Sequence, residues 1–261
     1  MHPQKDRTTL AYFKPDRIMW LLFLISLGIA SCNKSEDLPP PPPTQNPVDT
    51  MANDTSSQDT VRFNYLALGD SYTIGTGLPD TNDRYPKQLV ASLTADPLFM
   101  SNQPRIIAQN GWTTQNLITA IDQAEFDTTY GLVSLLIGVN NQFQNRPIDE
   151  YAIQFEQLLN TAIQLANNDT SRVFVLSIPD YGITPFGQAY PNASAGVDEF
   201  NSINLDITED YGVSYFNITE ISRKAENDPS LLAPDNLHPS GEMYALWVEL
   251  VLNEIKEKLY D

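Results

Sequence analysis

The chain has very few of the side chains that build disulfide frameworks and metal sites. Its 261 residues include one cysteine, Cys32, and two histidines, His2 and His238. One cysteine cannot form a disulfide within the chain, and so few His and Cys residues cannot assemble a transition-metal site of the usual kind. We therefore expect a folded domain that works without a disulfide, a metal ion or a cofactor.

Positive charge is also scarce. The sequence has 15 Lys and Arg residues against 33 Asp and Glu, which gives a formal net charge of −18 at pH 7. A surface this acidic repels the phosphate backbone, and this argues against nucleic acid as a partner. Apolar residues make up 41% of the chain, an ordinary share for a protein whose length suffices for one or two domains with a buried core.

The first 31 residues have the pattern of an export signal. Basic residues precede an apolar run at 18–30, which is shorter than the ~20 residues that a membrane-spanning helix needs. The run ends in Ile-Ala-Ser-Cys, which resembles a bacterial lipoprotein box whose cysteine becomes the lipidated first residue. The resemblance implies a cell-envelope protein anchored through Cys32 to the outer membrane, on its periplasmic or surface-exposed face. The alternative is a short membrane anchor.

Residues 32–61 have the composition of a tether. A proline run at 39–43 is typical of a semi-rigid polyproline II spacer. The polar stretch at 44–60 has almost no apolar residues, and we expect it to be disordered. A ligand for a proline-binding domain is the alternative for the proline run. The sequence thus predicts a signal peptide at 1–31, a tether at 32–61 and one folded domain at 62–261.

Within the folded domain, short apolar runs alternate with longer segments of helical periodicity. This alternation predicts an α/β fold with three layers, α/β/α, around a five-stranded parallel sheet. We expect strands at 63–68, 105–108, 132–137, 172–178 and 213–216, and helices at 86–93, 113–123, 148–166, 197–211 and 241–260. In such sheets ligands bind in the loops beyond the carboxyl ends of the strands.

Those loops contain the parts that acyl transfer requires. A serine needs an imidazole to take its proton, the imidazole needs a carboxylate, and the oxyanion needs preorganised donors. Ser71 follows the first predicted strand on a glycine-preceded turn. His238 is the only histidine left once the signal is removed, and Asp235 precedes it by three residues. Candidate oxyanion donors are the backbone N–H group of Gly111 and the side-chain amide of Asn140.

The order of these segments resembles the SGNH hydrolases, also called GDSL esterases or lipases. The segments are Gly-Asp-Ser at 69–71, a glycine at 111, Gly-x-Asn at 138–140 and Asp-x-x-His at 235–238. The resemblance spans most of the chain from residue 63 to 260. It implies Ser71 as nucleophile, an Asp235–His238 pair completing the triad, and an oxyanion hole made by Ser71, Gly111 and Asn140. It also implies a flavodoxin-like sheet in the order 2-1-3-4-5.

The sequence departs from the family pattern at one place, and single segments have simpler interpretations. The third segment of the family usually reads Gly-x-Asn-Asp, whereas Asn141 stands in the last position here. Taken alone, Ser71 could cap a helix and His238 could be a surface residue. All the segments in order favour catalysis, with Asp70 bracing the nucleophile turn.

The substrate is less constrained by the sequence. Aromatic and apolar residues near the predicted loops are candidates for a pocket: Tyr72, Ile74, Trp112, Tyr181, Ile183 and Phe186. They could equally cover the end of the sheet. We expect a monomeric serine esterase acting on short-chain acyl esters of a small molecule, a glycan or a lipid. The alternatives are an acyltransferase with the same triad and a surface binding lipoprotein without turnover.

Overall fold

The computed structural model describes residues 60–261, which are built around a parallel β-sheet. The strands of this sheet are β2 (Tyr65–Gly69), β4 (Arg105–Ala108), β5 (Leu132–Leu136), β6 (Val173–Leu176) and β7 (Ser214–Phe216). They lie in the order β4-β2-β5-β6-β7, and each neighbouring pair is parallel. Counted along the chain, this order is 2-1-3-4-5, so the predicted fold class and strand order are confirmed. The predicted signal peptide, Cys32 and nearly all of the tether lie outside the described residues.

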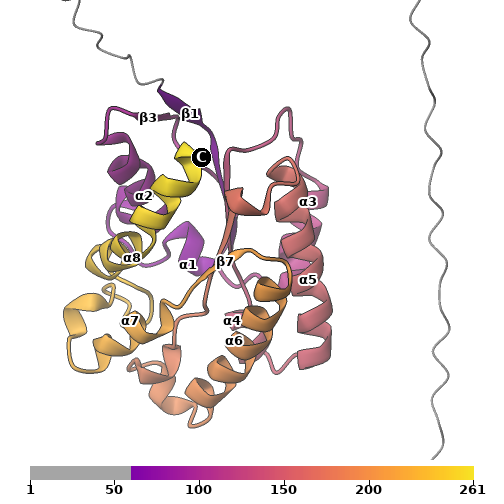
Figure 1. Ribbon diagram of the computed structural model, residues 1–261. Helices are drawn as coiled ribbons and strands as arrows, with labels where there is room; N and C mark the ends of the chain where they lie inside the picture. The colour runs from indigo at the N-terminus through magenta and orange to yellow at the C-terminus, as the bar shows by residue number, and fades with distance from the viewer. Residues whose placement is uncertain (1–59) are drawn as a thin grey trace, which may run out of the picture. The chain divides into compact units, whose positions relative to one another are not determined.

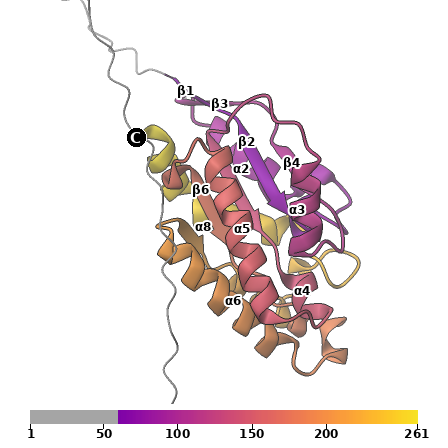
Figure 2. The same cartoon turned by 90° about the vertical axis from the view of Figure 1, so that its right-hand side faces the viewer.

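Five long helices cover the two faces of the sheet (Figure 1). They are α2 (Tyr85–Thr94), α3 (Thr114–Asp122), α5 (Ile148–Leu165), α6 (Ala193–Asp210) and α8 (Gly241–Tyr260). Helices α2 and α8 pack together on one face, whereas α5 packs between α3 and α6 on the other, as Figure 2 shows. This is the three-layer arrangement that the alternating pattern predicts.

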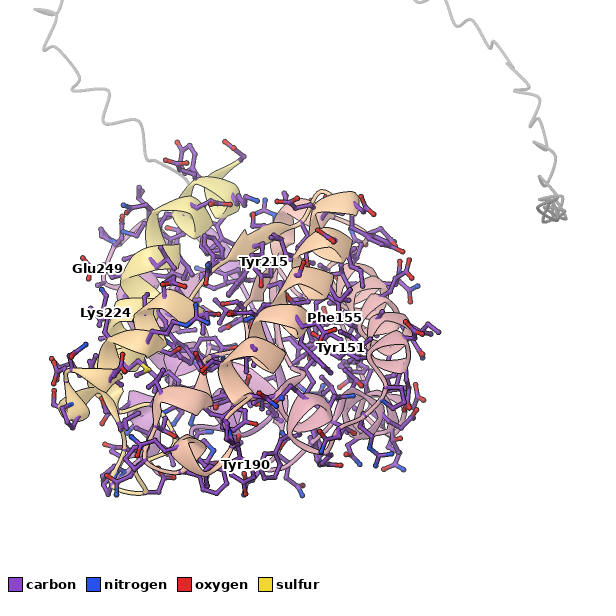
Figure 3. The ribbon with its side chains drawn as sticks, turned by 90° about the horizontal axis from the view of Figure 1, so that it is seen from below. Tyr151, Phe155, Tyr190, Tyr215, Lys224 and Glu249 are labelled. Carbon is purple, nitrogen blue, oxygen red and sulfur yellow. The ribbon has the colours of Figure 1, made fainter. Side chains whose placement is uncertain are left out.

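Burial explains why these segments take these forms. Every residue of β2 and β5 is buried, as expected for central strands of a sheet that has helices on both faces. On α5, the residues that repeat at intervals of three and four are buried, among them Tyr151 and Phe155. Their rings lie side by side, with centroids 5.7 Å apart (Figure 3). A stripe with this period faces the sheet along the whole helix.

Several short elements were not predicted. Strand β1 (Val61–Phe63) pairs in parallel with β3 (Phe99–Ser101) in a separate small sheet. The predicted strand at 63–68 is divided at Asn64, whose side chain bonds the backbone of Thr129 and Gly131. Short helices also follow three strands: α1 (Ser71–Ile74), α4 (Val139–Phe143) and α7 (Thr219–Arg223). Two of them, α1 and α4, contain candidate catalytic residues, Ser71 and Asn140, in segments that were predicted to be loops.

Residues 60–261 contain no helix that is both long enough and apolar enough to cross a bilayer.

Candidate active site

The carboxyl ends of the parallel strands bring distant residues to one edge of the sheet. Ser71 begins α1 directly after β2, Asn140 lies on α4 after β5, and Tyr181 lies in a short turn after β6. His238 comes from the loop that precedes α8. All four side chains line the same pocket. The sheet topology therefore assembles a site from segments up to 167 residues apart.

Ser71 is held at the first position of a very short helix. Asp70 caps this helix, because its Oδ1 accepts a hydrogen bond from the Tyr72 backbone N–H at 3.0 Å. Gly69 precedes it at the end of β2, so close to the Leu136 carbonyl oxygen of β5 that a Cβ atom there would overlap it. The turn is therefore tight, and Ser71 is 4% exposed. Its environment is the pocket rather than open solvent.

The loop before α8 pairs His238 with Asp235. The ring Nδ1 of His238 lies 2.7 Å from Asp235 Oδ2. The other carboxylate oxygen, Oδ1, accepts hydrogen bonds from the backbone N–H groups of Leu237 and His238, both at 3.0 Å. Asn236 makes the turn with a φ of 58°, a conformation that Asn tolerates better than most residues. With Nδ1 donating to the carboxylate, Nε2 of a neutral ring is the proton acceptor.

Gly77 packs against the carboxylate of Asp235, which sequence reasoning did not find. Its φ is +85°, and a Cβ atom at this position would lie 2.5 Å from Asp235 Oδ2. Only glycine combines this backbone conformation with this close approach. No motif points to Gly77, since the contact joins segments far apart in the sequence.

Asn140 connects two of the loops at the pocket. Its Nδ2 donates a hydrogen bond to the Trp112 carbonyl oxygen at 2.9 Å, and an amide nitrogen carries a second hydrogen that is left for the pocket. Gly111 lies in the same loop as Trp112, with a φ of +79° and open space where a side chain would be. The pocket is lined by its neighbour Asn110 rather than by Gly111 itself.

Asn141 supports the same two loops from the buried side. Its Oδ1 accepts a hydrogen bond from the Thr114 backbone N–H at 2.9 Å, and its Nδ2 donates to the Thr114 hydroxyl at 2.7 Å. That hydroxyl in turn bonds Gln154 Oε1 on α5. Asn141 is 1% exposed. The amide therefore ties the start of α4, which bears Asn140, to the start of α3, three residues after Gly111.

The candidate substrate residues divide into two groups. Tyr72, Tyr181 and Phe186 line the pocket with Ser71, Asn140 and His238. Ile74 and Trp112 do not line it, and Trp112 instead packs partly buried against the core. Ile183 lines a second cavity instead.

Four further pocket residues were not singled out from the sequence: Asn110, Val139, Phe143 and Leu237. Phe143 lies three residues after Asn140, so the two share a face only because the segment is helical. Its ring is 5.9 Å from that of Tyr181 and 5.9 Å from that of Phe186, centroid to centroid. The i, i+3 spacing of Asn140 and Phe143 could have indicated that both side chains face the pocket, but only if the segment had been predicted to be helical.

The two carboxylates near Ser71 lie in opposite environments. Burial raises the pKa of Asp235. The hydrogen bonds from the backbone N–H and the ring of His238 together outweigh this effect, so the pKa lies below its usual value. Asp235 therefore stays ionised at neutral pH and orients His238. Asp70 is fully buried and its Oδ2 has no hydrogen-bond partner. Burial raises its pKa from 3.8 to about 7, although the Tyr72 N–H opposes the shift.

Residues 60–261 contain no cluster of three or more His, Cys, Asp or Glu side chains placed to hold a metal ion.

Comparisons with known proteins concern the family and the fold. The model of one family, described as the GDSL-like lipase/acylhydrolase family, matches residues 67–246. None of the curated proteins matches the chain.

Three of the similar solved structures show the same fold. TesA has a TM-score of 0.60 at 15% identity, over 75% of this chain and 99% of TesA. Axe2, an acetylxylan esterase from Geobacillus stearothermophilus, has a TM-score of 0.57 at 19% identity, over 76% of this chain and 94% of Axe2. A lipolytic G-D-S-L family member from Veillonella parvula has a TM-score of 0.54 at 18% identity, over 72% of this chain and 96% of its own.

The buried carboxyl of Asp70 makes stability depend on pH. Between about pH 4 and 7 the unfolded chain ionises this group while the folded chain keeps it protonated, so folding stability falls as pH rises. Asp70→Asn cannot ionise. We expect its free energy of unfolding, relative to the wild type, to increase by up to about 1.4 kcal/mol per pH unit across this window and to level off above pH 7.

Urea denaturation at pH 5, 6, 7 and 8 measures this difference. Asp127→Asn is the control, because Asp127 is exposed and its carboxylate stays in water. A difference between wild type and Asp70→Asn that is the same at every pH would contradict the assignment.

Proposed function

The chain belongs to the GDSL-like lipase/acylhydrolase family, and we propose that it is a serine esterase that hydrolyses short-chain acyl esters through Ser71, His238 and Asp235. The observation that carries the proposal is the 2.7 Å contact of His238 Nδ1 with Asp235 Oδ2, on a ring that lines the same pocket as Ser71.

The first half of the reaction forms an acyl-enzyme. His238 Nε2 takes the proton of the Ser71 hydroxyl as Oγ attacks the ester carbonyl carbon. Asp235 remains ionised and stabilises the imidazolium through Nδ1. The tetrahedral intermediate then collapses, the bond to the alcohol oxygen breaks, and His238 returns the proton to the leaving alcohol.

The second half repeats these steps with water. His238 takes a proton from water, the hydroxide attacks the acyl carbon, and Ser71 leaves with the proton from His238. In both halves the negative oxygen needs donors, for which we propose the N–H groups of Ser71 and Gly111 and Nδ2 of Asn140. Each such donor is worth about 2.7–4 kcal/mol in other enzymes. The Asn140 bond to Trp112 supports this role because it orients the amide in advance.

The rim of the pocket supports an alcohol with a ring. Phe143 is 38% exposed, and Phe186 and Tyr190 are each 41% exposed. The three rings contact one another, with centroids 5.2–5.9 Å apart. Large apolar faces at a pocket mouth mark a contact surface, and a sugar ring also has an apolar face to place on them. One structural neighbour is an acetylxylan esterase, so we propose a short acyl group on a carbohydrate as substrate.

We also propose that the enzyme works as a monomer held at the bacterial cell envelope. The support is in the sequence: the apolar run at 18–30 ends at Cys32, the only cysteine, and a proline-rich segment follows. A lipid on Cys32 with a tether of about thirty residues leaves the catalytic domain free to reach its substrate.

The central test is hydrolysis of p-nitrophenyl acetate, butyrate and octanoate by the purified full chain. We expect turnover that is highest on the two shorter esters and falls at least ~1,000-fold in Ser71→Ala, because the nucleophile is lost. Turnover that persists in Ser71→Ala would contradict the triad. No turnover on any of the three esters would contradict the esterase proposal and favour its two alternatives, an acyltransferase or a binding protein.

A second prediction concerns the glycine behind the catalytic acid. Gly77→Ala pushes a methyl group into the Asp235 carboxylate, so we expect kcat on p-nitrophenyl acetate to fall about 10- to 100-fold while KM changes little. Gly212→Ala is the matched control, since Gly212 also has a positive φ, +65°, but no atom near its Cβ position. Thermal melting checks that both variants fold. Equal kcat in the two variants would show that the Gly77 contact is not needed.

The envelope location has its own test. In bacteria fed a labelled fatty acid, we expect the wild-type chain to incorporate label and to sediment with membranes. Cys32→Ala should lose the label, because the acceptor thiol is gone. A wild-type chain found unlabelled in the soluble fraction would refute the lipid anchor.

A further inference from the structure

A second, smaller cavity adjoins the active-site pocket. It shares two lining residues, Tyr72 and Leu237, with the active-site pocket. The two side chains therefore form a dividing wall. Most other residues around the second cavity are apolar: Pro179, Ile183, Leu232, Pro239 and Met243.

Three polar side chains around this second cavity, those of Asp180, Thr184 and Ser222, are already engaged in hydrogen bonds. The Asp180 carboxylate accepts hydrogen bonds from the Gly182 N–H at 2.8 Å and the Ser194 hydroxyl at 2.9 Å, and pairs with Arg223 at 3.0 Å. The Thr184 hydroxyl donates to the Tyr181 carbonyl oxygen at 2.6 Å.

Ser222 is engaged in the same way. Its hydroxyl donates to the Thr219 carbonyl oxygen at 2.6 Å and accepts from the Asp180 N–H at 2.9 Å. With these three side chains satisfied and most of the lining apolar, the cavity favours apolar ligands over water.

The wall stands next to the reacting groups. Tyr72 and Leu237 are the chain neighbours of Ser71 and His238, and the Tyr72 ring lies 5.6 Å from the His238 ring, centroid to centroid. Their backbones are held independently of the side chains. The Tyr72 carbonyl oxygen accepts from the Tyr244 hydroxyl at 2.8 Å, and the Leu237 N–H donates to Asp235. A change of either side chain alters the wall while these backbone bonds remain.

The wall lies on the closed side of the site. Tyr72 is 3% exposed, whereas the rings at the opening, Phe143 and Phe186, are about two fifths exposed. The alcohol has to leave for solvent after the first half-reaction, while the acyl group stays bound to Ser71. A methylene chain also needs no hydrogen-bond partners. The closed, apolar side therefore suits the acyl chain, and the open side suits the alcohol.

We propose that Tyr72 and Leu237 are the specificity-determining residues that end the acyl site, and that the cavity behind them would hold the additional methylenes of a longer chain once the wall is opened. The proposal rests on the ester hydrolysis proposed above and names the residues that limit its acyl group.

The test compares kcat/KM for p-nitrophenyl octanoate with that for butyrate. We expect the octanoate-to-butyrate ratio to rise at least ~10-fold in Tyr72→Ala and several-fold in Leu237→Ala, since a methylene that finds an apolar cavity gains roughly 10-fold or more. Tyr72→Phe keeps the ring and should keep the wild-type ratio. Leu237 is only half-buried, so Leu237→Ala tests the wall even if Tyr72→Ala fails to fold.

A third substitution shows where the longer chain goes. Ile183 lines the second cavity but not the active-site pocket, so Ile183→Phe fills only the space behind the wall. Added to Tyr72→Ala or to Leu237→Ala, it should return the ratio to the wild-type value. An unchanged ratio in both alanine variants, or a gain that Ile183→Phe does not reverse, would overturn the proposal.

A binding measurement separates this proposal from the proposed reaction. Calorimetric titration of the Ser71→Ala variant with octanoic acid measures the affinity for the acyl chain without any turnover. We expect the added Tyr72→Ala or Leu237→Ala substitution to tighten binding at least ~10-fold, and Ile183→Phe to reverse the gain. Absence of esterase activity in the wild type would refute only the proposed ester hydrolysis. Octanoate affinity that stays the same in the alanine variants would refute the proposal that Tyr72 and Leu237 end the acyl site.

Discussion

The hydrogen bond of 2.7 Å between His238 and Asp235 is the interaction on which the site depends. Three residues of a surface loop would not hold it alone. The loop is closed by backbone bonds from Ala233 N–H to the His238 carbonyl oxygen at 2.7 Å and from Ser240 N–H to the Leu231 carbonyl oxygen at 2.8 Å. Ser240 then caps α8, which packs along α2. The Tyr244 hydroxyl on α8 donates a hydrogen bond to the Tyr72 carbonyl oxygen, so the same helix connects the His238 loop to the turn that bears Ser71.

The two carboxyl groups near Ser71, those of Asp235 and Asp70, differ in exposure and in hydrogen bonding. Asp235 is about one third exposed and receives three hydrogen bonds from Leu237 and His238, so it keeps its charge at little cost. Asp70 is buried with one oxygen unpartnered, which costs stability whenever it is charged. Asp70 is enclosed in the tight turn between β2 and α1, where it caps the short helix that begins at Ser71. A destabilising buried group next to a proposed catalytic residue is typical of a site that gives up stability for geometry.

The sequence predicts the parts of this structure that follow from local patterns. The runs at 132–137 and 172–178 are apolar because both faces of the central strands are covered, and the strand order follows from the resemblance. Two features could not be predicted. The segment after Gly138 has the residues of a loop but forms α4, and five residues are too few to show a helical period in the sequence. Gly77 contacts Asp235 across 158 residues, and no local pattern encodes such a contact.

Asn141 shows how a departure from a family pattern can be read physically. A carboxylate at this position could accept from both the N–H and the hydroxyl of Thr114, but it would then use the hydroxyl proton that now bonds Gln154. The amide accepts with Oδ1 and donates with Nδ2, so Thr114 keeps its proton for α5. An amide also places no charge in a position that is 1% exposed, near the predicted oxyanion hole. A negative charge there would oppose the charge that develops on the substrate oxygen.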